Sequence, residues 1–198
     1  MILSLSGATA LILCLWFTHQ KIGYWKESEI LYRHAIAVTE KNELAHDNLA
    51  AALVRKGRRD EAIAELQKAV EIAPDYALAQ ANLGVMLLGK GRFDESIIHS
   101  RAALKLLPNF AGAHRNLGTA LGAKGHVDEA IVELTEAARL APNDAETRYN
   151  LGYALASKGL LDDAIVQYQE LVRLQPGNTS ARQTLEAALA KRAAAPKQ

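Results

Sequence analysis

The sequence predicts an all-α protein, built as an array of helical hairpins behind an N-terminal membrane-spanning helix. Three observations predict this fold class. The residues from Met1 to Thr18 include no charged side chain. From residue 43 onwards, small residues, glycines and prolines return every 34 residues. Within each 34-residue unit, apolar residues recur with the period of a helix and not with the alternation of a strand.

The N-terminal run has the length and composition of a membrane span. At about 1.5 Å per residue it would be about 27 Å long, close to the ~30 Å hydrocarbon core of a bilayer. A cleaved signal peptide is the alternative, but no lysine or arginine precedes the run, and the small-x-small triplet Ala8-Thr9-Ala10 comes too early in it. We therefore expect a transmembrane helix over residues 1–20 that places the chain in a membrane.

Residues 24–42 have the pattern of a lone second helix of an incomplete repeat. Ser28, Tyr32 and Ala35 lie one period before the small, large and small residues of the next second helix. The place of the missing first helix is taken by the membrane run. We therefore expect the repeats to begin within a turn or two of the bilayer.

Four full units follow, over residues 43–76, 77–110, 111–144 and 145–178. A glycine in the middle of each unit permits a left-handed backbone at a tight turn, and a proline near its end stops the second helix because it has no N–H to donate. The glycines are Gly57, Gly91, Gly125 and Gly159, and the prolines are Pro74, Pro108, Pro142 and Pro176. Residues 179–192 then predict a capping helix, and residues 193–198 a disordered tail.

Further motifs recur in every unit. The first helix carries Asn-Leu-Gly or Asn-Leu-Ala, and the second begins with Asp-Glu-Ala-Ile or a close variant. With the 34-residue period, this pattern resembles the tetratricopeptide repeat (TPR) family. The resemblance implies a right-handed superhelix of helix-turn-helix repeats with a concave groove that binds proteins. The sequence departs from the family where a large aromatic residue is common early in the first helix, at His46, Gln80, His114 and Arg148.

Candidate binding residues follow from the helical angle of about 100° per residue, which turns one asparagine per unit toward the groove. A carboxamide can donate to and accept from the backbone of an extended peptide. The alternative, that each amide bonds to the neighbouring repeat, stays open. The last repeat adds two tyrosines as binding anchors, or as packing partners of the capping helix. The predicted peptide-binding residues are Asn48, Asn82, Asn116, Asn150, Arg115, Tyr149 and Tyr153.

Composition and motifs favour binding over catalysis. The formal charge of +1 and the lack of a basic stripe argue against nucleic acid. The sequence has no phosphate-loop, nucleophile-elbow or zinc-protease motif, and its six histidines are not at metal-ligand spacing. Each second helix begins with a pair of acidic residues. Negative charge stabilises a helix N-terminus, so these pairs indicate a structural role and not a catalytic carboxylate pair. We therefore expect no catalytic residue, metal, cofactor or small-molecule substrate.

Two functions remain. The first is a single-pass, membrane-tethered scaffold that binds peptide segments of other proteins in the groove. The second rests on Gln20 to Asn48, which resemble the junction before the C-terminal repeats of protein-mannosyltransferase-like membrane glycosyltransferases. That resemblance implies an acceptor-presenting portion of a multispanning protein O-glycosyltransferase.

The two functions place the repeats on opposite sides of the membrane. For a single-span protein, Lys21, Lys26 and Arg33 after the apolar run predict a cytoplasmic location. The glycosyltransferase resemblance implies the extracytoplasmic side, which the absence of basic residues before the run favours. Both sides stay open.

Overall fold

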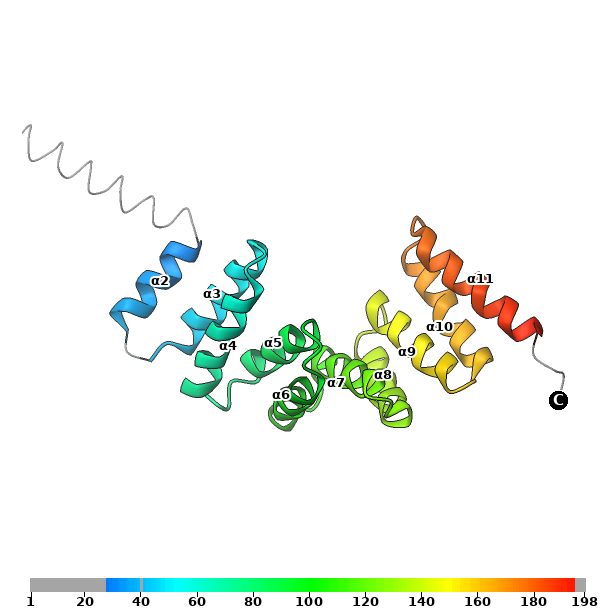
Figure 1. Ribbon diagram of the computed structural model, residues 1–198, viewed down its shortest axis with the longest axis horizontal. Helices are drawn as coiled ribbons and strands as arrows, with labels where there is room; N and C mark the ends of the chain where they lie inside the picture. The colour runs from blue at the N-terminus through cyan, green and yellow to red at the C-terminus, as the bar shows by residue number, and fades with distance from the viewer. Residues whose placement is uncertain (1–27, 40, 195–198) are drawn as a thin grey trace, which may run out of the picture. The chain divides into compact units, whose positions relative to one another are not determined.

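The computed structural model describes residues 28–39 and 41–194, in which all regular secondary structure is α-helical (Figure 1). The chain divides into two compact units: unit 1 ends at Pro74, and unit 2 begins at Asp75. No helix within the described ranges has the length and apolar character needed to cross a membrane. The predicted membrane helix, residues 1–20, lies outside them.

Unit 1 contains α2 (Ser28–Val38), α3 (Glu43–Arg55) and α4 (Arg59–Ile72), and α3 packs against both other helices. The Asn42 side chain caps α3 by accepting a hydrogen bond from the Ala45 backbone N–H at 2.9 Å. Gly57, with φ of 76°, makes the left-handed turn between α3 and α4. Leu49 and Leu53 of α3 are fully buried. Residues 24–27 of the predicted lone helix are outside the described ranges, and α2 forms the rest of it.

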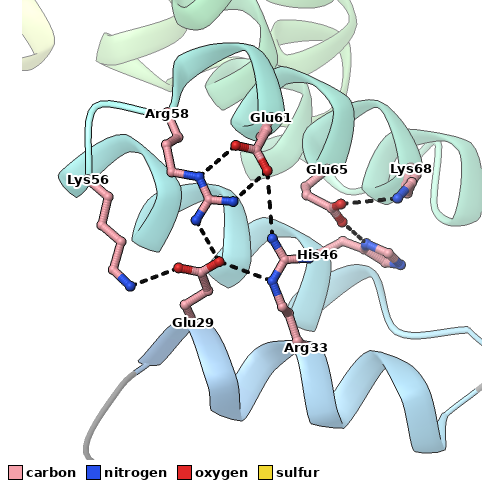
Figure 2. A network of polar contacts seen from close by, with 8 residues as sticks. All are labelled: Glu29, Arg33, His46, Lys56, Arg58, Glu61, Glu65 and Lys68. Atoms are coloured by element: carbon pink, nitrogen blue, oxygen red, sulfur yellow. Dashed lines mark hydrogen bonds and ion pairs between the residues drawn. The ribbon is translucent and has the colours of Figure 1, made fainter.

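A buried carboxylate joins α2 to the α3–α4 hairpin (Figure 2). Glu29 accepts hydrogen bonds from Lys56 Nζ at 2.8 Å, Arg58 Nη1 at 2.7 Å and Arg33 Nε at 3.0 Å. Its side chain is only 11% exposed, and it occupies the repeat position that Ile63 holds one period later. The hydrogen bonds from Lys56, Arg33 and Arg58 lower the pKa of Glu29 to about 2, although burial raises it. An ion cluster therefore replaces an apolar contact at this junction.

The packing of α2 is expected to depend on acid pH. Because the pKa of Glu29 is lowered from 4.5 to about 2 in the folded protein, its stabilising effect is present above pH 4.5 and lost as the pH falls toward 2. Hydrogen exchange of α2 amides, corrected for the intrinsic effect of pH, should therefore show less protection near pH 3 than near pH 6. Glu29→Gln is the control. Because its amide does not titrate, the difference in α2 protection between pH 3 and pH 6 should shrink in this variant. Equal protection of the parent at both pH values would contradict this role of Glu29.

Unit 2 is a helical solenoid of stacked hairpins. Consecutive helices pack in chain order, and the first helices α5, α7 and α9 also contact one another. The pairs α5–α6, α7–α8 and α9–α10 fall within the second, third and fourth predicted repeats. The helices are α5 (Ala77–Leu88), α6 (Phe93–Leu106), α7 (Ala111–Ala123), α8 (Val127–Leu140), α9 (Ala145–Ser157), α10 (Leu161–Leu174) and α11 (Thr179–Ala194).

The boundaries of unit 2 follow its local chemistry. Gly91, Gly125 and Gly159 adopt φ values of 73°, 84° and 85° at the turns within the hairpins. A continuous core runs from Ile97 through Leu134 and Tyr168 to Ala188 of α11, so α11 covers the end of the array. It continues through Ala194, two residues into the predicted tail, because residues 193 and 194 are alanines, the best helix formers.

Candidate functional site

The four positions that depart from the aromatic pattern each make a hydrogen bond across their own hairpin. The partner always stands 19 residues later, on the second helix. The pairs are His46 Nδ1 to Glu65 Oε2 at 2.6 Å, His99 Nδ1 to Gln80 Oε1 at 2.7 Å, His114 Nδ1 to Glu133 Oε2 at 2.6 Å, and Arg148 Nη1 to Gln167 Oε1 at 2.9 Å.

These polar pairs join the two helices of a hairpin. Burial lowers the pKa of His99, which favours the neutral ring, and its Nδ1–H then donates to Gln80. Burial also raises the pKa of Glu65, but hydrogen bonds from His46 and Lys68 bring it below its ordinary value. No group of three metal-ligating side chains gathers within residues 28–39 and 41–194.

Two of the predicted asparagines bond to the preceding repeat. Asn116 is buried, and its amide donates to the Ala81 carbonyl at 3.3 Å. The Asn150 amide donates to Thr119 Oγ1 at 3.0 Å. In these two contacts the amide bonds to the neighbouring repeat, α7 to α5 and α9 to α7, as in the alternative to peptide binding.

The other two asparagines differ from this pair. Asn48 is exposed and donates to the Leu44 carbonyl of its own helix at 2.8 Å. Asn82 is half-buried on α5. The role of the four asparagines in peptide binding stays a prediction.

Single alanine substitutions should affect folding stability differently at the buried Asn116 and the exposed Asn48. Asn116→Ala removes the hydrogen bond that links α7 to the Ala81 carbonyl of α5 and is expected to cost about 1 kcal/mol of folding free energy, the usual net contribution of one hydrogen bond. Asn48→Ala, at an exposed site, should change stability by less than about 0.5 kcal/mol. Urea unfolding of both variants against the parent checks this. Equal stabilities of the two variants would mean that the Asn116 hydrogen bond is not structural.

A pocket of about 430 Å³ lies between α7 and α9, and we call it the α7/α9 pocket. Its lining carries no charged side chain and combines small and aliphatic residues with two tyrosines, the hydroxyls of one threonine and one serine, and a carboxamide. Binding sites for small groups commonly have this character and a volume of about 300–1,000 Å³. The lining residues are Gly118, Thr119, Gly122, Ala123, Val127, Leu134, Tyr149, Asn150, Tyr153, Ala154 and Ser157.

The tyrosines are the exposed aromatic residues of this pocket. Tyr153 is 61% exposed and Tyr149 44%. The Tyr149 ring lies 6.4 Å from the ring of Tyr168 at a tilt of 46°, and burial raises the pKa of Tyr168 to about 12. Tyr149 also lines a second pocket of about 250 Å³ with Ala181 and Thr184 of α11. Tyr149 therefore combines packing with exposure, whereas Tyr153 is mainly exposed.

Arg115, the remaining predicted binding residue, is engaged in ion pairs. Its Nη1 lies 2.6 Å from Asp144 Oδ2 and 3.4 Å from Glu146 Oε2. Asp144 precedes α9 and accepts from the Glu146 backbone N–H and from Thr147 Oγ1. Burial raises the pKa of Asp144, but the hydrogen bonds from Thr147 and Arg115 outweigh it and bring the pKa below its ordinary value. Arg115 thus links α7 to the start of α9 through these ion pairs. It does not line the α7/α9 pocket.

Sequence profiles of the tetratricopeptide repeat match residues 42–109 and 115–179. These segments are tetratricopeptide repeats. No curated protein matches the chain by sequence. The repeats do occur in the same form in solved structures that align over most of this chain.

Three solved structures illustrate the likeness. YrrB, described as a TPR protein with an unusual peptide-binding site, is 25% identical, with a TM-score of 0.68 over 82% of this chain and 84% of its own. MamA of Desulfovibrio magneticus RS-1 is 23% identical (TM-score 0.68, 76% and 85% covered). TTC0263, a thermophilic TPR protein of Thermus thermophilus, is 23% identical (TM-score 0.64, 90% and 97% covered). The last two show the fold alone.

Proposed function

We propose that this TPR protein is a binding scaffold that holds extended peptide segments of other proteins at the α7/α9 pocket. The observation that carries the proposal is this uncharged pocket of about 430 Å³, with Tyr149 and Tyr153 exposed on it. The protein acts by binding a partner and not by catalysis. The description of YrrB as having a peptide-binding site supports the same class of function.

The chemistry of the lining defines the peptide. Val127, which is half-buried, offers apolar contact beside the small residues Gly122 and Ala123, so the pocket takes an uncharged aliphatic or aromatic side chain. A charged side chain would lose its hydration there without an ionic partner. Tyr153 covers the bound side chain, since tyrosine supplies a large contact area at a low cost in conformational entropy. The Asn150 carboxamide lies beside the peptide backbone.

Peptide selection tests this proposal. A random peptide library displayed on phage is selected on the full-length chain, immobilised through its C-terminus. Enriched peptides should share one large apolar residue with no charge at that position, and a chain carrying Tyr153→Ala should retain few of them. If the parent and the Tyr153→Ala chain enrich the same peptides equally, the pocket is not the binding site.

Membrane tethering is a separate proposal and rests on the uncharged run from Met1 to Thr18. Extraction of membranes with alkaline carbonate tests it, since an integral protein stays in the pellet. The other candidate function, an acceptor-presenting portion of a protein O-glycosyltransferase, rests only on the resemblance of Gln20 to Asn48. The three structures described above do not add to it.

A further inference from the structure

The second helices of unit 2 expose one β-branched aliphatic residue each, on the side away from the first helices. Ile98 of α6, Val132 of α8 and Val166 of α10 are 63%, 66% and 52% exposed and stand 34 residues apart. β-Branched residues are weaker helix formers than the polar residues usual on an exposed face. Neither the packing of the hairpins nor the α7/α9 pocket accounts for them.

An ion pair links α6 and α8 beside two of the aliphatic residues. Arg101, one turn after Ile98, reaches from α6 to Glu129 of α8 with its Nη2 3.6 Å from Glu129 Oε2. Glu129 in turn lies one turn before Val132. Side chains of α6 and α8 therefore meet beside Ile98 and Val132.

Charged rows flank the aliphatic row on both sides. Four residues before each aliphatic residue stands an exposed aspartate, and seven residues after it stands an exposed lysine or arginine. Offsets of four and seven keep all three on one face of a helix. We call this face the outer band; its rows are Asp94, Asp128 and Asp162, then Ile98, Val132 and Val166, then Lys105, Arg139 and Arg173.

The charged rows alone have a local explanation, since acids favour helix N-termini and bases favour C-termini. Several of these charges also have partners within the chain, such as Lys158 with Asp128 at 2.6 Å and Arg173 with Glu170 at 2.8 Å. Exposed pairs of this kind contribute little and can exchange partners. The aliphatic row between them is the feature that needs a partner of its own.

We propose that the outer band binds a second copy of this chain about a two-fold axis that runs along the aliphatic row. This axis reverses the helix direction, so the aspartate row of one copy faces the basic row of the other. Each aliphatic residue then faces its counterpart in the other copy. An axis parallel to the helices would place aspartate against aspartate, which complementarity of charge excludes. Because the outer band has only three residues on each of three helices, the interface is small, as in weak complexes that bury less than about 1,200 Å².

Sedimentation equilibrium of the full-length chain tests the proposal. A non-ionic detergent keeps the apolar N-terminal run from driving association, and the series extends to about 100 µM, where weak interfaces of this size are populated. The parent should form a dimer, and Val132→Lys should raise its dissociation constant at least tenfold without loss of helix. Tyr153→Ser, which changes the α7/α9 pocket, should leave the dimer intact. A parent that stays monomeric throughout, or a Val132→Lys chain that associates like the parent, overturns the proposal.

Disulfide trapping tests the direction of the axis. In a Cys14→Ser background, chains carrying Ile98→Cys should cross-link to one another. A mixture of chains carrying Ile98→Cys with chains carrying Val166→Cys should give little of the mixed product, since these residues lie on different helices of the row. Preferential mixed cross-linking would show the opposite orientation and overturn the proposed axis.

Discussion

Gly118→Leu is expected to cost about 1–3 kcal/mol of folding free energy, or more, by overpacking the contact between α7 and α8. A Cβ atom at residue 118 would lie 2.7 Å from Leu134 Cγ and 3.0 Å from the Ala130 carbonyl oxygen. The Leu134 side chain is fully buried, and the carbonyl belongs to the α8 backbone, so neither can move without shifting the helix. Thermal denaturation followed by circular dichroism should show a loss of about 2–4 °C per kcal/mol.

Gly122→Ala is the matched control on the same helix. A Cβ atom there would lie 3.6 Å from Ala130 Cβ, an ordinary contact. Alanine also favours a helix over glycine by about 0.5–1 kcal/mol, so this variant should melt at or above the parent temperature. If Gly118→Leu melts with the parent, the close approach of α7 to α8 is not as described.

Tyr153→Ala is expected to weaken binding of a selected peptide at least tenfold while leaving the melting temperature nearly unchanged. Tyr153 is 61% exposed, so its removal takes little from the core. Hot-spot aromatics contribute about 2 kcal/mol or more to binding, and 1.4 kcal/mol already equals a factor of ten in Kd. Isothermal titration calorimetry measures the affinity.

Two further variants test whether the effect of Tyr153→Ala is specific to the α7/α9 pocket. Leu189→Ala removes a large side chain of α11 that is 40% exposed and lies outside the α7/α9 pocket, and it should leave the affinity unchanged. Tyr149→Ala should lower both affinity and stability, because the Tyr149 ring also contacts Tyr168. An equal affinity of Tyr153→Ala and the parent would exclude Tyr153 as an anchor.

The helical hairpins could be predicted from sequence because local chemistry sets their ends. Gly125 is an example, since its φ of 84° is the left-handed turn that the 34-residue spacing predicts. The cap of α3 by Asn42, which was not predicted, is a local interaction of the same kind. Such features depend only on neighbouring residues, so a single sequence reveals them.

Features that depend on the partner side chain could not be predicted. His46 and His114 were recognised as departures from the aromatic pattern, but their hydrogen bonds to Glu65 and Glu133 require the packed hairpin. Glu29 stands at a position where the later repeats carry isoleucine, and only the fold brings three cations to it.

The candidate site shows the same limit. Asn150 and Tyr153 were identified from helical angles alone, and both line the α7/α9 pocket. The volume of that pocket depends on small residues of α7, such as Gly122 and Ala123, whose effect on the surface does not follow from a helical angle. Asp144, which binds Arg115, was missed, although its place just before α9 is a cap position.

Photo-cross-linking tests the central claim, peptide binding at the α7/α9 pocket, most directly. Ser157, exposed on the pocket lining, and Thr135, exposed on the outer side of α8, are replaced in separate full-length chains by a benzophenone amino acid. A selected peptide is added, the sample is irradiated, and the adduct is located by mass spectrometry. We expect cross-linking from residue 157 that excess unlabelled peptide abolishes, and none from residue 135. Cross-linking from residue 135 alone, or equally from both, would contradict binding at this pocket.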